Sequence, residues 1–149
     1  MMKISKEALN FNKEILFGEA GAVIAAPLFS HIFSKFSLSP TVLATWTVIS
    51  VMVTASLLWL VMRIYDKTRN GKIETGKFIG DLAYLTPVAS ALAFTIYYPT
   101  LFFLSRYFFE NSYRVASSAA ISQMSAFALF LFSLNMYRYF LLRITGRKL

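Results

Sequence analysis

Four long apolar stretches constrain this chain more than any other feature. They run from about Ile15 to Phe36, Pro40 to Met62, Phe78 to Ser105 and Val115 to Leu142. A helix needs ~20 mostly apolar residues to cross a membrane, and each stretch is long enough. Only 15% of the 149 residues are charged, whereas soluble domains have ~25%. The sequence therefore predicts an all-α integral membrane protein, with residues 1–149 forming one bundle of four transmembrane helices.

The basic residues predict the orientation of these spans. Twelve of the fifteen Lys and Arg residues fall before the first span, between the second and third, or at the C-terminal end: Lys3, Lys6, Lys13, Arg63, Lys67, Arg69, Lys72, Lys77, Arg138, Arg143, Arg147 and Lys148. The other two connections hold only Lys35, Arg106 and Arg114. Cytoplasmic loops carry the excess of basic residues, so we expect a multi-pass protein of the cell membrane with both termini cytoplasmic. This pattern explains the net charge of +8, and no nucleic-acid partner is expected.

The segment before the first span, residues 1–14, has two interpretations. Ile4, Ala8, Phe11 and Ile15 follow a helical spacing, and the lysines fall elsewhere. This spacing is typical of an amphipathic helix that lies in the membrane interface. The alternative is a frayed basic tail.

The two halves of the chain match each other weakly. The first and third spans open with similar triplets, Phe17-Gly18-Glu19 and Ile79-Gly80-Asp81, and each then meets a proline, Pro27 or Pro87. The second and fourth spans close alike, with an arginine followed eight residues later by a glycine: Arg63 and Gly71, Arg138 and Gly146. The match predicts two helical hairpins of the same orientation, a parallel repeat of a kind found in transporters.

Glu19 and Asp81 are the acidic residues of the apolar stretches. A carboxylate in a span costs roughly 2.5–3.5 kcal/mol at the helix centre and usually faces the bundle interior. Arg63 and Arg138 leave the membrane on the same predicted side and are candidate partners. Three roles remain open: a salt-bridge ring that joins the hairpins, a coupling pair for protons or cations, and a binding site for an anionic head group beside the arginines.

Other residues of the spans give weaker signals. Pro27 and Pro87 either mark a substrate site, as interrupted helices do in transporters, or kink the helices only for packing. Gln123 and Asn135 are predicted to form interhelical hydrogen bonds, or else to line a polar pathway. The aromatic run from Tyr97 to Phe109 is expected to face lipid.

An enzyme is the less favoured class. The chain has no cysteine and one histidine, and it lacks a phosphate-binding loop and the zinc-protease and serine-hydrolase motifs. We expect no catalytic residues, metal or cofactor. The leading hypothesis is a small transporter or flippase of a lipid-linked or amphipathic substrate, and the alternative is a non-catalytic accessory or scaffold subunit. Four spans enclose little volume, so we expect the bilayer as partner and either a homo-oligomer or a larger membrane complex.

Overall fold

The computed structural model describes residues 6–69 and 86–145, and these ranges are helical apart from two turns at 35–39 and 111–114. The elements, in chain order, are α1 (Lys6–Ser34), α2 (Pro40–Arg69), α4 (Thr86–Leu92), the π-helical turn η1 (Ala93–Tyr97), α5 (Tyr98–Glu110) and α6 (Val115–Thr145). Residues 6–14 of the predicted amphipathic segment are helical and continuous with the rest of α1.

The described residues contain four helical segments long and apolar enough to cross a membrane: Ile15–Ser34, Pro40–Tyr65, Pro87–Glu110 and Val115–Tyr137. The predicted all-helical fold with four such helices is therefore confirmed for this part of the chain. The third segment consists of α4, η1 and α5 in succession. It ends at Glu110, past the predicted end at Ser105, and Arg106 and Glu110 form an ion pair of 2.7 Å across its last turn. Its predicted beginning at Phe78 lies outside the described residues.

One short turn connects the two long helices of each hairpin. Ser37 and Ser112 have positive φ angles of 53° and 59°, the left-handed conformation that commonly ends a helix. The side chain of Ser39 then accepts a hydrogen bond of 3.4 Å from the backbone N–H of Val42. Ser39 thus caps α2, whose first residue is Pro40, a residue suited to the first helical turn.

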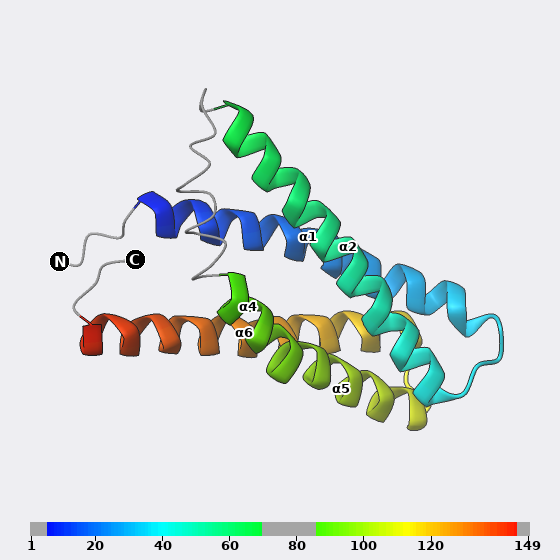
Figure 1. The fold of residues 1–149 in the computed structure, drawn as a ribbon. Helices are drawn as coiled ribbons and strands as arrows, with labels where there is room; N and C mark the ends of the chain where they lie inside the picture. The colour runs from blue at the N-terminus through cyan, green and yellow to red at the C-terminus, as the bar shows by residue number, and fades with distance from the viewer. Residues whose placement is uncertain (1–5, 70–85, 146–149) are drawn as a thin grey trace.

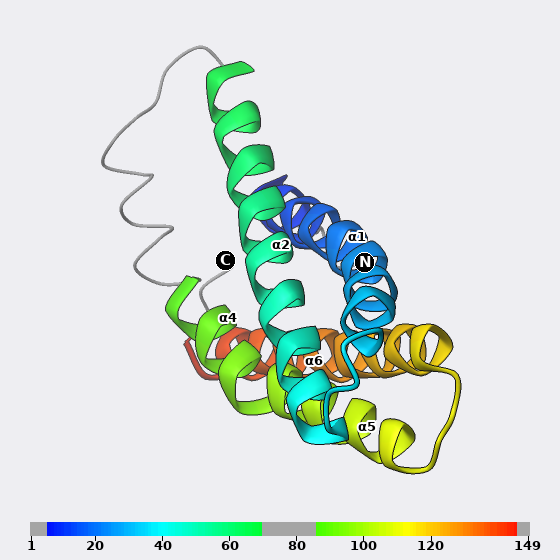
Figure 2. The ribbon, with the colours of Figure 1, turned by 90° about the vertical axis from the view of Figure 1, so that its right-hand side faces the viewer.

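The four long helical segments form a ring. Helix α1 packs against α2 and α6, and α5 packs against the same two helices. The beginning of α1 and the end of α6 lie at one end of the bundle, whereas both turns lie at the other end (Figure 1). Figure 2, viewed from the end with the turns, shows α2 crossing in front of α6. The chain thus forms two helical hairpins that pack on each other.

The contact between α1 and α2 depends on small residues. A Cβ atom on Gly18 would lie 2.9 Å from the carbonyl oxygen of Ala55, and one on Gly21 would collide with the side chain of Leu58. Close backbone approach of this kind is typical of helices packed within membranes. Further along the same contact, the hydroxyls of Ser30 and Thr47 share a hydrogen bond of 2.7 Å.

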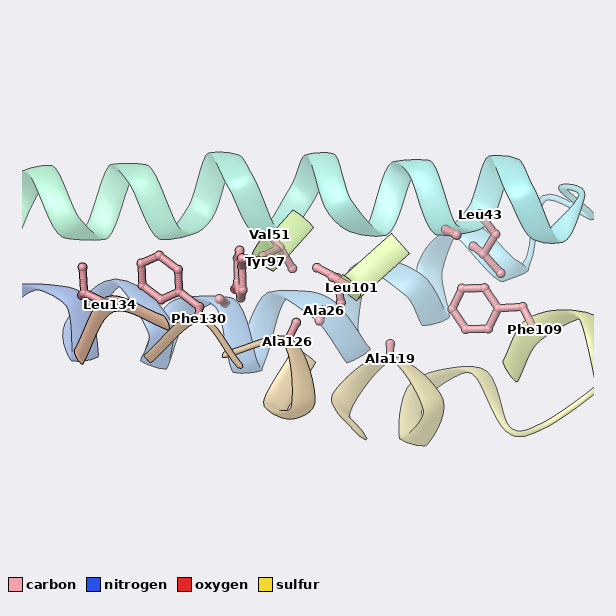
Figure 3. Packing of buried hydrophobic residues seen from close by; sticks show 12 residues of the cluster. Ala26, Leu43, Val51, Tyr97, Leu101, Phe109, Ala119, Ala126, Phe130 and Leu134 are labelled. Atoms are coloured by element: carbon pink, nitrogen blue, oxygen red, sulfur yellow. The ribbon is translucent and has the colours of Figure 1, made fainter. Parts of the chain in front are cut away.

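The core lies between the two hairpins (Figure 3). Alanines at helix crossings, such as Ala26 and Ala126, are fully buried and let the backbones approach. Leu101 and Leu134 fill the space between the helices and are at most 1% exposed. Many other apolar side chains point outwards, as lipid-facing residues do in a membrane bundle. The helices are apolar on all sides, which is typical of membrane spans.

The second half of α2 stays packed against α1 but diverges from the third helical segment. Helix α2 packs against α5, while α4 and η1 pack against α6. In Figure 1 the C-terminal half of α2 runs away from α4, so the two hairpins separate at the end where α1 begins. This divergence creates the space for the site described below.

Candidate functional site

Glu19 faces the interior of the bundle. It lies on the same side of α1 as the buried residues Ala22 and Ala26, and Glu19 itself is only 8% exposed. This placement agrees with the expectation that an acid within a span avoids lipid.

The third helical segment changes its hydrogen-bond register just before Pro99. Residues Ala93–Tyr97 form a π-helical turn, and the backbone N–H of Tyr98 donates to the carbonyl of Ala93, five residues earlier. Proline lacks an N–H, and its ring clashes with the carbonyl four residues before it, here that of Thr95. A π turn accommodates this clash by adding a residue to the turn. Such single turns occur frequently at functional sites.

The π turn directs Tyr97 towards Glu19. The hydroxyl of Tyr97 donates a hydrogen bond of 3.1 Å to Oε2 of Glu19, and the residue is 5% exposed. The expectation that the whole aromatic run faces lipid is therefore wrong for Tyr97. It is also wrong for Phe109, which is buried in the core, whereas Phe103 and Tyr107 are exposed. Pro99 follows the π turn that places Tyr97.

Gln123 completes a network that joins three helical elements. Its Nε2 atom donates a hydrogen bond of 2.8 Å to Oε1 of Glu19 and a second, short one to the hydroxyl of Tyr97. Gln123 is fully buried. Its Oε1 atom has no hydrogen-bond partner within the described part of the chain. Both oxygens of the Glu19 carboxylate thus accept a hydrogen bond from a neutral group (Figure 3 shows Tyr97 within this core).

Asn135 does not belong to this network. It is exposed, and its Nδ2 atom donates to the carbonyl of Leu131 on its own helix at 2.9 Å. Of the two amides predicted to form interhelical bonds or a polar pathway, only Gln123 reaches another helix. The physical reason is that twelve residues correspond to about one third of a turn beyond whole turns at 3.6 residues per turn, so the two amides face different sides of α6.

The predicted pairing of Glu19 with Arg63 is not observed among the described residues, where the ion pair is Arg106 with Glu110. Arg63 is nevertheless buried, at 4% exposed, and its guanidinium carbon lies 5.1 Å from the centre of the Trp59 ring. Asp81 and the side chain of Arg138 lie outside the described residues.

The two prolines of the predicted repeat do not contact the network. Pro27 is half-buried inside α1, which continues as an α-helix through it. Pro87 is exposed and is the second described residue of α4. Neither lines the cavity described next. Tyr97 does line the cavity, but nothing in the sequence distinguishes it from its aromatic neighbours. The proline two residues later could have indicated a local change of helical register.

A cavity of about 370 Å³ adjoins Glu19 and Tyr97. It lies between the second half of α2 and the segment formed by α4 and η1, with residues of α1 and α6 completing its wall. Its lining is mostly apolar and aromatic, and Glu19 is the charged residue among the described residues that form it: Ile15, Gly18, Glu19, Ala55, Ser56, Trp59, Leu60, Ala89, Ser90, Ala93, Tyr97, Tyr98, Phe127 and Phe130. Concave, mostly apolar cavities with a few polar groups are typical small-molecule sites.

Comparison of the chain with protein families, with curated proteins and with solved structures finds no match. The function must therefore be argued from the fold and from this site.

Proposed function

We propose that this chain is a multi-pass protein of the cell membrane that transports or flips an amphipathic or lipid-linked substrate, with Glu19 as the coupling acid. The observation that carries the proposal is the position of Glu19, whose buried carboxylate adjoins an apolar cavity between the helices. The parallel-repeat architecture predicted from the sequence belongs to the same proposal.

The energetics of Glu19 favour function over packing. A charged group within a span is costly, and such groups mark ion or substrate pathways by default. Neutral donors, Tyr97 and Gln123, hold its carboxylate. A salt-bridge ring would instead surround the acid with arginines, and no arginine is among the described residues that line the cavity. This arrangement leaves the negative charge available to a proton or a substrate.

The orientation follows from the basic residues. The positive-inside rule places both termini and the connection between α2 and α4 in the cytoplasm. The cavity is lined by the beginning of the α1 span and the second half of α2, so it lies in the cytoplasmic half of the bundle in this orientation. We propose that substrate binds there from the cytoplasmic side.

Four spans enclose little volume, so a full pathway would form more easily with a second copy of the chain or another subunit. A homo-oligomer suits a transporter, whereas stoichiometric foreign subunits suit an accessory role. Native mass spectrometry of gently extracted protein separates these assemblies.

Transport itself is tested in proteoliposomes with three fluorescent probes: a labelled phosphatidylcholine, the cation ethidium and the anion 8-anilinonaphthalene-1-sulfonate. We expect the protein to move at least one probe and Glu19→Gln to abolish that movement while remaining monodisperse. The matched control is Glu110→Gln, which removes an exposed carboxylate on α5 and should preserve transport. Movement of none of the probes, or full activity of Glu19→Gln, would contradict the proposal.

A further inference from the structure

The described lining of the cavity offers a ligand a carboxyl group but no basic side chain. The lining contains one acidic residue, Glu19, and no lysine, arginine or histidine. Each carboxylate oxygen accepts one hydrogen bond from a neutral donor, and an ionised carboxylate offers about four lone-pair sites. Lone pairs therefore remain for a further donor, and a donor that also carries positive charge gains the most.

The aromatic residues of the lining attract the same kind of ligand. Trp59, Phe127 and Phe130 present rings to the cavity, and the face of an aromatic ring attracts cations. Trp59 already binds one, because the guanidinium carbon of Arg63 lies 5.1 Å from the ring centre. The guanidinium of Arg63 thus already lies against Trp59, so the aromatic contacts considered for a ligand are those of Phe127 and Phe130.

We infer that the cavity binds an amphipathic organic cation, with the positive group against Glu19 and the apolar body against the aromatic wall. This inference rests on the proposed function for the movement of the ligand across the membrane, but binding alone tests it. An inorganic divalent cation fits less well, because Ca²⁺ takes about 6–8 oxygen ligands and the cavity offers few. A hydrophilic cation would lose its hydration against apolar walls.

The volume agrees with such a ligand. Small-molecule cavities measure roughly 300–1,000 Å³, and this one measures about 370 Å³. The cavity therefore holds a compact ligand of several rings or branched alkyl groups around one charge.

Two ions of the same shape and opposite charge provide the sharpest test. Tetraphenylphosphonium and tetraphenylborate differ mainly in charge, so apolar burial is nearly matched. We expect the purified protein in a neutral detergent to bind tetraphenylphosphonium at least about tenfold more tightly than tetraphenylborate, measured by isothermal titration calorimetry. Since truncating one partner of a buried charge pair weakens binding strongly, Glu19→Gln should weaken tetraphenylphosphonium binding by about tenfold or more.

Two further variants make the test specific. Ala89→Leu adds volume to the cavity wall without touching Glu19 and should also weaken binding, whereas Glu110→Gln removes a carboxylate outside the cavity and should leave it unchanged. If Glu19→Gln fails to fold, Ala89→Leu and the comparison of the two ions still decide the result. Equal binding of both ions, or unchanged binding in Glu19→Gln and Ala89→Leu, would overturn the inference.

The outcomes also separate this inference from the proposed function. Tight, Glu19-dependent binding of tetraphenylphosphonium without movement of any probe in proteoliposomes supports the binding site and contradicts transport. Glu19-dependent movement of the labelled phosphatidylcholine without binding of tetraphenylphosphonium supports transport and overturns the cation site.

Discussion

The Tyr97 hydroxyl donates a hydrogen bond of 3.1 Å to Glu19, a residue 78 positions earlier in the chain. This bond crosses between the two hairpins, and both residues are buried. A π turn just before Pro99 thereby places the hydroxyl that binds a carboxylate on another helix. The stability of the bundle and the properties of the cavity depend on the same contact.

Removing the Tyr97 hydroxyl should destabilise the protein. Hydrogen bonds to charged groups contribute about 1.5–3 kcal/mol, and Tyr97→Phe leaves Oε2 of Glu19 without its donor. We expect a lower midpoint of thermal unfolding in detergent, followed by intrinsic fluorescence. Tyr107→Phe is the control because Tyr107 is exposed, and its midpoint should not change. An unchanged midpoint in Tyr97→Phe would show that the bond contributes nothing.

The π turn should depend on Pro99. Pro99→Ala restores a backbone N–H that can donate to Thr95, so we expect the segment Ala93–Tyr97 to become α-helical and Tyr97 to rotate away from Glu19. A double-mutant cycle measures this coupling. In the Pro99→Ala background, Tyr97→Phe should lower the free energy of unfolding by less than about 0.5 kcal/mol. A change this small is within the scatter seen for sites that do not interact. An equal cost in both backgrounds would mean that the turn forms without the proline.

The two amides of α6 should respond differently to the same substitution. Gln123→Leu removes the donor to Oε1 of Glu19, and a buried polar group without its partner costs about 1–3 kcal/mol. Asn135→Leu removes only a bond to its own helix at an exposed position, so we expect little loss of stability. The midpoints of thermal unfolding of the two variants, measured side by side, check this. A larger loss in Asn135→Leu would contradict the assignment.

The absence of cysteine makes the orientation directly testable. Ser37→Cys places a thiol in the turn between α1 and α2, and Thr68→Cys places one at the exposed end of α2. The positive-inside rule predicts that a membrane-impermeant maleimide labels Ser37→Cys in intact cells and Thr68→Cys only after permeabilisation. The parent chain, without thiols, is the blank. The reverse labelling pattern would invert the proposed topology.

The four-helix architecture could be predicted because it depends on the length of apolar stretches, which the sequence states directly. Glu19 and Gln123 could be identified as candidates for the same reason, since polar residues stand out in apolar spans. Tyr97 could not, because one aromatic residue among many gives no contrast. The π turn also shifts the helical register by a residue, so a regular periodicity misplaces every side chain on one side of it.

Choosing between Gln123 and Asn135 required knowledge of which face of α6 is buried. Hydropathy does not reveal that face, because the helix is apolar all around. The small residues do give a signal: Ser122 and Ala126 are fully buried, and Gln123 shares their face of the helix. Asn135 lies off this face. Ser122 and Ala126 therefore indicate the buried amide better than polarity alone.

The network around Glu19 also has a mechanical consequence. Between the described parts of the two hairpins, every side-chain hydrogen bond passes through Glu19, Tyr97 or Gln123. The bond between Ser30 and Thr47 and the close glycine contacts join α1 to α2 within one hairpin. Glu19 therefore accepts the side-chain hydrogen bonds that join the described parts of the two hairpins, so a change at this one residue removes both of them.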